Sequence, residues 1–289
     1  MRCACIDIGS NTTRLLVADT AHGGLGAVLQ QRAFTRIGRK LGADGGISAH
    51  CIADVAAVVA AQRAAAEQAG AQHVRVVATA AIRAAPNRAA LVRALRERAG
   101  VEAVILSGQD EARLAFAGAV ATLPVAPAGA VAVVDVGGGS TEVALGTAPG
   151  GVTWWASFPI GSSALAGRQP PDPLPAERLA AMRARAAAAF AALDAPAPDV
   201  ALAVGGSAAS LPRLAGRTLD APALERALAR LAAAPAQEIA AEHGIELERV
   251  LLLPAGLLVL GAVAERLGRP LSVAHGGLRE GVVLELARS

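Results

Sequence analysis

The segment VAVVDVGGGSTEVAL at residues 131–145 predicts a strand, a tight turn and a second strand. The apolar run Val131–Val134 ends at Asp135, three consecutive glycines follow, and the chain becomes apolar again after Glu142. Glycine permits backbone dihedral angles that other residues avoid, and it lets a ligand approach bare N–H groups. A carboxylate beside an anion-binding turn suggests a metal ion that bridges the two. The segment therefore predicts a phosphate-sized binding turn with a carboxylate at its edge.

A second segment near the N-terminus has the same layout. IDIGSNTTRLLV at residues 6–17 matches VDVGGGSTEVAL at residues 134–145, and Asp7 lies 128 residues before Asp135. The repeat predicts two similar halves, each opening with a strand–turn–strand hairpin. Elsewhere strands alternate with helices, which favours a mainly parallel sheet covered by helices. The segment 124–129, rich in proline, alanine and glycine, is the predicted boundary between the halves.

Composition excludes several classes of protein. The 289 residues carry a formal charge of +3, and Lys40 is the only lysine among 27 basic residues. Basic runs interleaved with aromatic residues are absent, which argues against a nucleic-acid surface. Cys3, Cys5 and Cys51 do not form a disulfide framework and indicate buried thiols in a reducing cytoplasm. No signal peptide precedes the first predicted strand, and prolines and glycines interrupt the longest uncharged run, 114–134, so we expect a cytoplasmic protein without a membrane span.

Four glycine-containing turns each follow an apolar strand, at residues 9–12, 137–141, 205–207 and 276–281. Open α/β sheets bind ligands at the carboxyl ends of their strands, so four such turns are stronger evidence than one. The alternative is that the glycines only permit tight turns, and for 205–207 this alternative stays open. None of the four turns matches the GxxxxGK[ST] pattern of P-loop proteins.

These segments closely resemble the exopolyphosphatase / guanosine pentaphosphate phosphohydrolase family, which belongs to the actin, Hsp70 and sugar-kinase superfamily. The resemblance spans nearly the whole chain, in order, through IDIGSNTTRLLV (6–17), ATAAIR (78–83), SGQDEARLAFAGA (107–119), VVDVGGGSTEVALG (133–146), VGGSAASL (204–211) and GGLREGVV (276–283). It implies an α/β fold of two actin-like, ribonuclease H-like domains with a cleft between them. We expect domain I over residues 1–124 and domain II over 125–289, with the last helix, about 278–289, as a candidate to pack back on domain I.

The resemblance also implies an activity and its central residues. The expected enzyme releases terminal orthophosphate from inorganic polyphosphate, from pppGpp or from both, with Mg²⁺ or another divalent cation. Glu111 corresponds to the catalytic glutamate that orients and deprotonates the attacking water. Judged by the residues alone, Asp110 and Glu111 could merely complement a helix N-terminus, and we expect Asp110 to keep that role. Asp135 is the expected Mg²⁺ ligand and Asp7 a second carboxylate, directly or through water; each could instead cap its own turn.

Backbone amides of the two hairpin turns and nearby arginines are expected to bind phosphate. Arginine suits bidentate phosphate recognition, although any one of the 26 arginines can be a solvated surface charge. Arg83 and Arg279 are stronger candidates than Arg14. Glu142 could bind a metal-bound water or pair with one of these arginines, and the sequence does not decide. The expected phosphate-binding residues are Gly9, Ser10, Asn11, Thr12, Arg14, Arg83, Gly137, Gly138, Gly139, Ser140, Thr141 and Arg279.

Partners and rival functions follow from the same resemblance. Longer family members add a C-terminal helical domain of the HD type, which this chain lacks, so we expect a preference for short polyphosphate chains or weak processivity. Expected ligands are polyphosphate or guanosine penta- and tetraphosphate, without nucleic acid or membrane, and the alanine-rich faces permit a homodimer. An alternative is a regulatory protein that binds (p)ppGpp or polyphosphate with little turnover, against which the intact Glu111 argues. A third alternative, an ATP-dependent kinase of the same superfold, is disfavoured by the family-specific segment SGQDEARL.

Overall fold

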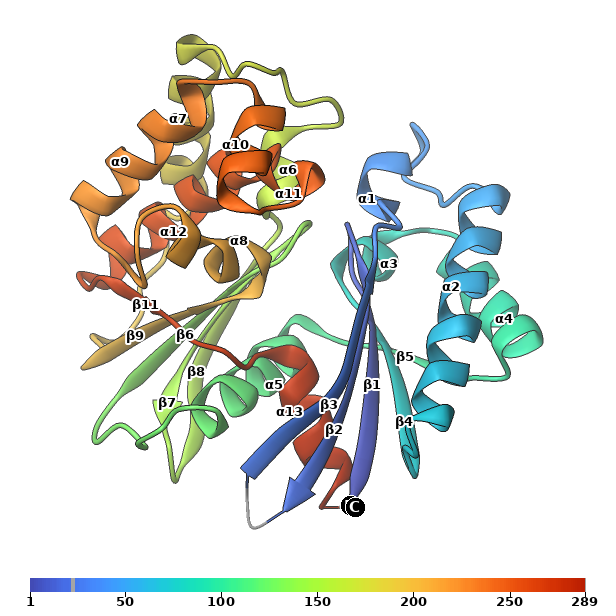
Figure 1. The fold of residues 1–289 in the computed structure, drawn as a ribbon. Coiled ribbons are helices and arrows are strands. Elements are labelled where there is room, and N and C mark those ends of the chain that lie inside the picture. Colours follow the sequence, from blue (N-terminus) through green and yellow to red (C-terminus); the bar gives the residue numbers. More distant parts are fainter. Residues whose placement is uncertain (22–23, 289) are drawn as a thin grey trace. The chain divides into compact units, whose positions relative to one another are not determined.

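The computed structural model describes residues 1–21 and 24–288. The chain divides into two compact units, each an α/β structure built on one sheet (Figure 1). Unit 1 comprises residues 1–122 and 276–289, and unit 2 comprises residues 123–275. The C-terminal segment, with the helix that was a candidate to pack back on domain I, thus lies in unit 1.

The sheet of unit 1 has five strands in the order β3–β2–β1–β4–β5. The central strand β1 pairs antiparallel with β2 and parallel with β4, while β3 and β5 form the two edges. The strands are β1 (Arg2–Ile8), β2 (Thr13–Ala21), β3 (Gly24–Ala33), β4 (His73–Ala78) and β5 (Ala103–Ile105).

Helices cover both faces of this sheet, which explains why β1 is apolar along nearly its whole length. Successive side chains of a strand point to opposite faces. Accordingly Ala4, Ile6 and Ile8 join one buried cluster, whereas Cys3 and Cys5 join another. The first cluster lies against α2 and α4, and the second lies against α5 and α13. The helices of unit 1 are α1 (Ile37–Lys40), α2 (Ala49–Gln68), α3 (Ala80–Ala84), α4 (Arg88–Ala99), α5 (Gly108–Ala121) and α13 (Leu278–Leu286).

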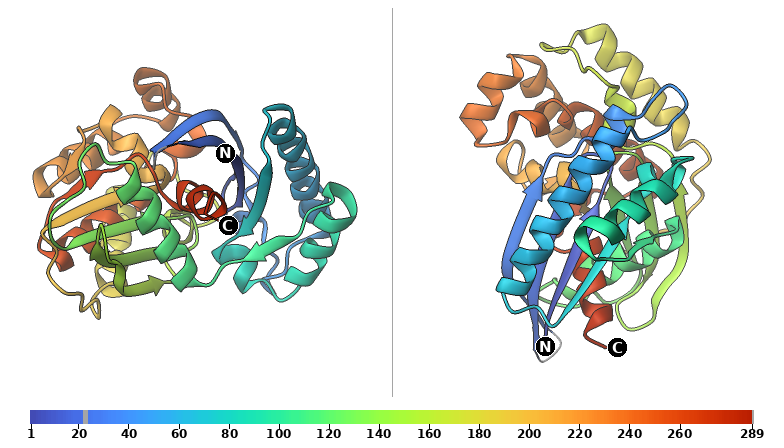
Figure 2. Two further views of the ribbon diagram at one scale, coloured as in Figure 1. Left: turned by 90° about the horizontal axis from the view of Figure 1, so that it is seen from below. Right: turned by 90° about the vertical axis from the view of Figure 1, so that its right-hand side faces the viewer.

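The C-terminal helix α13 packs on α5 and on the N-terminal strands, and Figure 2 shows it beside β1. Two glycines permit the close approach of the helices. A Cβ atom on Gly281 would overlap the carbonyl group of Leu114, and one on Gly118 would overlap the carbonyl group of Gly277. Glu285 adds polar contacts, because it accepts a hydrogen bond of 2.5 Å from Arg75 of β4 and an ion-pair contact of 2.8 Å from Arg113 of α5.

The sheet of unit 2 has six strands in the order β10–β11–β9–β6–β7–β8. Read from β8 to β11, this order repeats the order of unit 1 from β3 to β5, and β6 takes the place of β1 because it pairs antiparallel with β7 and parallel with β9. The predicted repeat of two halves is therefore confirmed. The strands are β6 (Val131–Val136), β7 (Thr141–Thr147), β8 (Gly151–Phe158), β9 (Val200–Val204), β10 (Thr218–Leu219) and β11 (Leu271–Val273).

One large apolar core holds unit 2 together, and α12 is its central helix because most of its residues are buried. Within the part of the chain that the structure describes, no helix is both long and apolar enough to cross a membrane. The helices are α6 (Ser162–Ala166), α7 (Ala176–Ala189), α8 (Gly205–Ser210), α9 (Ala221–Ala232), α10 (Ala236–His243), α11 (Leu247–Val250) and α12 (Leu253–Leu267), with a 3₁₀ turn at Leu211–Arg213.

Candidate active site

The turn at residues 9–12 connects β1 and β2 in unit 1. The ladder between these strands pairs Asp7 with Arg14 at the end of the hairpin. The N–H group of Gly9 donates a hydrogen bond of 2.9 Å to the carbonyl oxygen of Thr12, which closes the turn. A Cβ atom on Gly9 would lie only 3.1 Å from that oxygen, so glycine suits this position. The sequence Asp-x-Gly thus delivers a carboxylate and a tight turn to the same end of the sheet.

The carbonyl groups of this turn point to protein donors. Besides the bond within the turn, the carbonyl of Asn11 accepts a hydrogen bond of 2.9 Å from the N–H group of Arg36, and that of Ser10 accepts one of 2.7 Å from Gly38. Carbonyl dipoles would repel an anion, whereas successive N–H groups attract one. With these carbonyls engaged, the N–H side of the turn is suited to a phosphate group.

Two side chains of the same hairpin have buried polar atoms without a hydrogen-bond partner among the described residues. These atoms are Oδ1 of Asp7 and both Oδ1 and Nδ2 of Asn11, and Asn11 is only 7% exposed. Buried polar groups are nearly always satisfied, and the exceptions call for an explanation such as an ion or ligand. A phosphate or a hydrated metal ion at the turn would supply the missing partners.

Asp7 lies in a mixed group of charges in unit 1. Burial raises the pKa of Asp7, the positive charges of Arg279 and Arg14 lower it, and the negative charge of Glu280 raises it again, so that the pKa is higher than usual. Arg279 Nη2 is 3.8 Å from Glu280 Oε1, and Glu280 Oε2 accepts a hydrogen bond of 2.9 Å from the N–H group of Gly277. The structure therefore brings the predicted residues Asp7, Arg14 and Arg279 together.

The turn at residues 137–141 connects β6 and β7 in unit 2 and has the same geometry. Asp135 pairs with Glu142 across the ladder, as Asp7 pairs with Arg14 in unit 1. The N–H group of Gly137 donates a hydrogen bond of 3.0 Å to the carbonyl oxygen of Ser140. Both hairpins thus place an aspartate two residues before the glycine that closes the turn.

The carbonyl groups of this second turn also face protein donors. Gly137 and Gly138 each accept a hydrogen bond of 2.9 Å, from the N–H groups of Ser162 and Ser163 at the start of α6. The preceding Gly161 allows this approach, since a Cβ atom there would lie 2.6 Å from the carbonyl oxygen of Gly137. The turn therefore has its carbonyls engaged, as in unit 1, and its remaining predicted residues, Gly139 and Ser140, lie at its far end.

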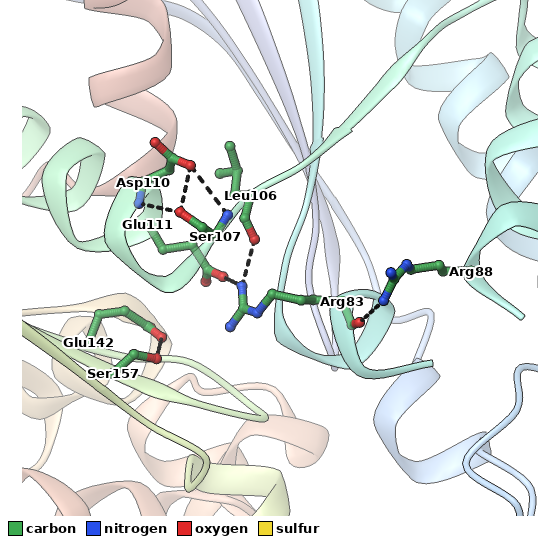
Figure 3. Close-up of polar contacts among 8 residues, drawn as sticks. All are labelled: Arg83, Arg88, Leu106, Ser107, Asp110, Glu111, Glu142 and Ser157. Atoms are coloured by element: carbon green, nitrogen blue, oxygen red, sulfur yellow. Dashed lines mark hydrogen bonds and ion pairs between the residues drawn. The ribbon is translucent and has the colours of Figure 1, made fainter. Parts of the chain in front are cut away.

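The side chains at the start of β7 are buried and have structural contacts. The hydroxyl group of Thr141 donates a hydrogen bond of 2.6 Å to the carbonyl oxygen of Ile160, so this hydroxyl holds the loop before α6. Glu142 is 3% exposed and accepts a hydrogen bond of 2.8 Å from the hydroxyl group of Ser157 on the neighbouring strand (Figure 3). Any contact of Thr141 with phosphate would have to involve groups other than its hydroxyl hydrogen.

The two acidic residues in the first turn of α5, Asp110 and Glu111, have different contacts. Asp110 forms a capping box with Ser107: the Ser107 hydroxyl group accepts a bond of 3.1 Å from the Asp110 N–H and donates one of 2.6 Å to the Asp110 carboxylate (Figure 3). This is the helix-capping role expected for Asp110. Glu111, the next residue, is 7% exposed and takes no part in the cap.

Arg83 holds the carboxylate of Glu111. Its Nη1 atom donates to Glu111 Oε1 and also donates a hydrogen bond of 2.7 Å to the carbonyl oxygen of Leu106 (Figure 3). A guanidinium fixed by a backbone carbonyl restricts the orientation of the carboxylate that it binds. The predicted phosphate-binding residue Arg83 and the predicted base Glu111 are therefore direct neighbours, which spacing in the sequence did not indicate.

The glycine turn after β9 lies next to the second hairpin. Gly205 has a φ of 91°, a left-handed conformation that favours glycine. A Cβ atom on Gly205 would lie 2.7 Å from the carbonyl oxygen of Val136 and 2.8 Å from Oδ1 of Asp135. This glycine therefore has a packing role beside the predicted metal ligand.

Arg249, a buried arginine beside the turn after β9, was not among the residues predicted from the sequence. It is 7% exposed, and a Cβ atom on Gly206 would overlap its guanidinium group. The hydroxyl oxygens of Ser163 and Ser207 are buried in the same unit without partners among the described residues. Nothing in the local sequence distinguishes Arg249 from the other arginines, because only the fold brings α11 to the turn after β9.

The carboxylates of the two hairpins are the candidate ligands of a divalent metal ion. Within residues 1–21 and 24–288, no three His, Cys, Asp or Glu side chains are grouped so as to hold a metal by themselves. Mg²⁺ does not require such a cage, since it commonly takes one or two carboxylates together with water and phosphate oxygens. Asp7 of unit 1, with its unpartnered Oδ1, and Asp135 of unit 2, at the equivalent strand end, each offer one such carboxylate within their own unit.

The chain is similar to known proteins in both sequence and structure. The model of the Ppx/GppA phosphatase family matches residues 16–289. Exopolyphosphatase 1 of Mycobacterium tuberculosis is 30% identical over 98% of this chain and 88% of that protein, and an uncharacterized protein of Streptomyces coelicolor is 32% identical over 98% and 90%. A solved PPX-GPPA enzyme of Aquifex aeolicus is 27% identical, with a TM-score of 0.80 over 99% of both chains. An exopolyphosphatase structure from Cytophaga hutchinsonii, 20% identical over 100% of this chain and 98% of that one, shares the fold with a TM-score of 0.87. The expected fold class, two actin-like α/β domains, is confirmed.

Proposed function

The chain belongs to the Ppx/GppA phosphatase family, and from this premise we propose that it is a phosphohydrolase that releases terminal orthophosphate from inorganic polyphosphate, from pppGpp or from both. The similarity to an exopolyphosphatase of Mycobacterium tuberculosis supports polyphosphate as a substrate. The position of the Glu111 carboxylate is the main support for this activity. Glu111 is buried, separate from the helix cap and held in one orientation by Arg83, as a general base requires.

In the proposed reaction, Glu111 removes a proton from a water molecule while the water oxygen forms a bond to the terminal phosphorus. The bond between that phosphorus and the bridging oxygen breaks, so orthophosphate leaves and the remaining chain is one phosphate shorter. Phosphoryl transfer depends mainly on in-line positioning and on neutralising the charge of the phosphate oxygens. A single oriented carboxylate is therefore sufficient as the base.

The hairpin turns are proposed to hold the phosphates through their N–H groups. In both turns the engaged carbonyls support this role, because the protein satisfies the groups that would repel an anion. Arg14 and Arg279 are proposed to balance the negative charge of the phosphates on the side of Asp7. Arg83 is proposed to serve both the phosphate and the orientation of Glu111.

We propose Mg²⁺ as the cofactor, with Asp135 as a ligand and Asp7 as a second carboxylate. When bound, the ion would neutralise negative charge on the phosphate oxygens. The unpartnered Oδ1 of Asp7 supports this assignment. The role of Glu142 is proposed to be indirect, because its carboxylate accepts the hydroxyl group of Ser157.

The experiment is an orthophosphate-release assay with Mg²⁺ on polyphosphates of defined length and on pppGpp, comparing the wild type with Glu111→Gln. The proposal expects release by the wild type and near loss in the variant. If the wild type bound these ligands but released no more phosphate than the variant, the chain would be a regulatory binding protein.

A further inference from the structure

A basic segment is attached to the first phosphate turn. Residues 36–40 carry Arg36, Arg39 and Lys40, and the last four of them form α1. The backbone N–H groups of Arg36 and Gly38 donate to the carbonyls of the turn, as described above. Figure 1 shows α1 at the same end of the unit 1 sheet as the carboxyl end of β1. The segment that carries these three cationic residues is therefore anchored, through Arg36 and Gly38, to the turn that is proposed to bind phosphate.

The contact between residues 35–38 and the β1–β2 hairpin is buried and includes a polar pair. Thr35 and Thr13 are each at most 5% exposed, and their hydroxyl oxygens lie 3.1 Å apart in a hydrogen bond. A Cβ atom on Gly38 would lie 3.3 Å from the Cβ atom of Ser10, which is a tight contact. The position of the segment on the turn is thus fixed by both backbone and side-chain contacts.

Arg36 has an unusual backbone conformation. Its φ of 54° and ψ of 36° place it in the left-handed region, and among the described residues it is the only non-glycine residue with a positive φ. Glycine adopts this conformation without the steric cost that a Cβ atom brings. Strained residues of this kind collect at ligand sites, where the side chain is needed. An arginine in this conformation is therefore a candidate for a ligand contact through its guanidinium group.

Two further observations concern the charge of the segment and its ligand. Lys40 Nζ lies 3.6 Å from Asp54 Oδ2, so part of its charge is balanced by the protein. Asn11, whose carbonyl is held by Arg36, has a buried side-chain amide without a partner among the described residues. An unsatisfied amide in a turn that contacts the backbone of Arg36 suits an anionic ligand with several oxygen atoms.

We propose that residues 36–40 form a second anion-binding element, in which Arg36 and Arg39 hold phosphate groups that lie farther along the chain than those bound at residues 9–12. This inference rests on the proposed function, because it assigns part of the substrate of the same site. A linear polyanion presents a charged phosphate at every repeat, so the turn and the cationic element can bind phosphates that lie several repeats apart, beyond the length of tripolyphosphate. Chains that reach both elements should therefore bind more tightly than chains that reach only one.

The test compares tripolyphosphate with long-chain polyphosphate. The variants are Arg36→Gly and Arg39→Gln, singly and together, with Arg98→Gln as a matched loss of one exposed arginine on α4 of the same unit. Loss of a charge-assisted contact should raise the KM for the long chain about tenfold in each single variant. The KM for tripolyphosphate and both values for Arg98→Gln should stay within about twofold of the wild type, the scatter expected when no contact is lost.

Arg36→Gly separates a binding role from a folding role. Glycine relieves the left-handed strain, so the melting temperature should not fall while affinity for the long chain does. An unchanged KM for the long chain in the double variant would overturn the inference. An equal rise for both substrates would also overturn it, because the segment would then act only by supporting the turn.

A binding measurement distinguishes failure of this inference from failure of the proposed function. Calorimetric titration of the wild type and the double variant with each polyphosphate, without added metal, requires no turnover. If the wild type released no phosphate from any substrate, the proposed function would fail. A selective loss of long-chain binding in the double variant would still support the second element, and equal binding by both proteins would refute it.

Discussion

Replacing Glu111 with glutamine is the most informative change in this chain. Glutamine has nearly the same shape, and its amide oxygen can still accept the hydrogen bond from Arg83 Nη1. Arg83 also keeps its bond of 2.7 Å to the carbonyl of Leu106. The substitution therefore removes the negative charge and the basicity of the side chain while it leaves the surrounding geometry largely in place.

The size of the effect follows from the role of a general base. Such a group contributes about 10²- to 10⁴-fold to a rate, which corresponds to roughly 3 to 5.5 kcal/mol of activation free energy. We expect kcat to fall by that factor and KM to change by less than about threefold, because the phosphate-binding turns are untouched. The free energy of unfolding should fall by only about 1 to 2 kcal/mol, since the partner Arg83 is 29% exposed and retains a backbone acceptor.

Asp110→Asn is the matched control, since it removes a carboxylate one residue away on the same helix. The structure gives Asp110 a capping role with Ser107. Neutralising it should cost about 0.5 to 1 kcal/mol of stability and leave the rate of phosphate release within about twofold. Initial rates of phosphate release across a range of substrate concentrations, with thermal unfolding of each variant, provide both quantities. A Glu111→Gln enzyme with wild-type kcat, or an equal loss of kcat in Asp110→Asn, would refute the assignment of the base.

Three further predictions concern stability, acid sensitivity and metal. Gly281→Ala should lower the free energy of unfolding in urea by about 2 kcal/mol or more, because its Cβ would overlap the Leu114 carbonyl; an unchanged midpoint would contradict the close packing of α13. Glu285→Gln should cost about 0.5 to 1 kcal/mol near neutral pH. Burial raises the pKa of Glu285, but Arg113 and Arg75 outweigh it and lower the pKa below its unfolded value, so this contribution is lost as the pH falls through the folded pKa and the two proteins should converge in acid. Asp135→Asn should raise the Mg²⁺ concentration for half-maximal phosphate release by about tenfold or more, and an unchanged requirement would exclude it as a ligand.

Local patterns in the sequence were sufficient to predict the hairpins and much of the sheet. The Asp-x-Gly turns after apolar strands predicted both β1–β2 and β6–β7, because tight turns need glycine and buried strands need apolar residues. The apolar strand expected before the turn at residues 205–207 is β9 (Val200–Val204). In contrast, β3 was not predicted, because most of its residues are exposed and its polar and glycine-rich sequence lacks a clear apolar alternation.

Features that depend on contacts between distant segments could not be read from the sequence. The bond between Arg83 and Glu111 joins the end of α3 to the start of α5, and Arg249 reaches Gly206 only because α11 folds onto the start of α8. Arg36 lies outside the motifs recognised in the sequence, and its left-handed backbone conformation is a property of the folded chain. The role of the Thr141 hydroxyl group likewise depends on the position of Ile160, a residue outside the hairpin.

The position of residues 276–289 has a consequence for how the protein is made. Val282 and Val283 complete the buried cluster that contains Cys3 and Cys5, yet the ribosome adds them only after the whole of unit 2. Domains usually fold in the order of their synthesis. Here residues 123–275 can fold while the N-terminal sheet still exposes one apolar face, so the half of the protein that is translated first is completed last.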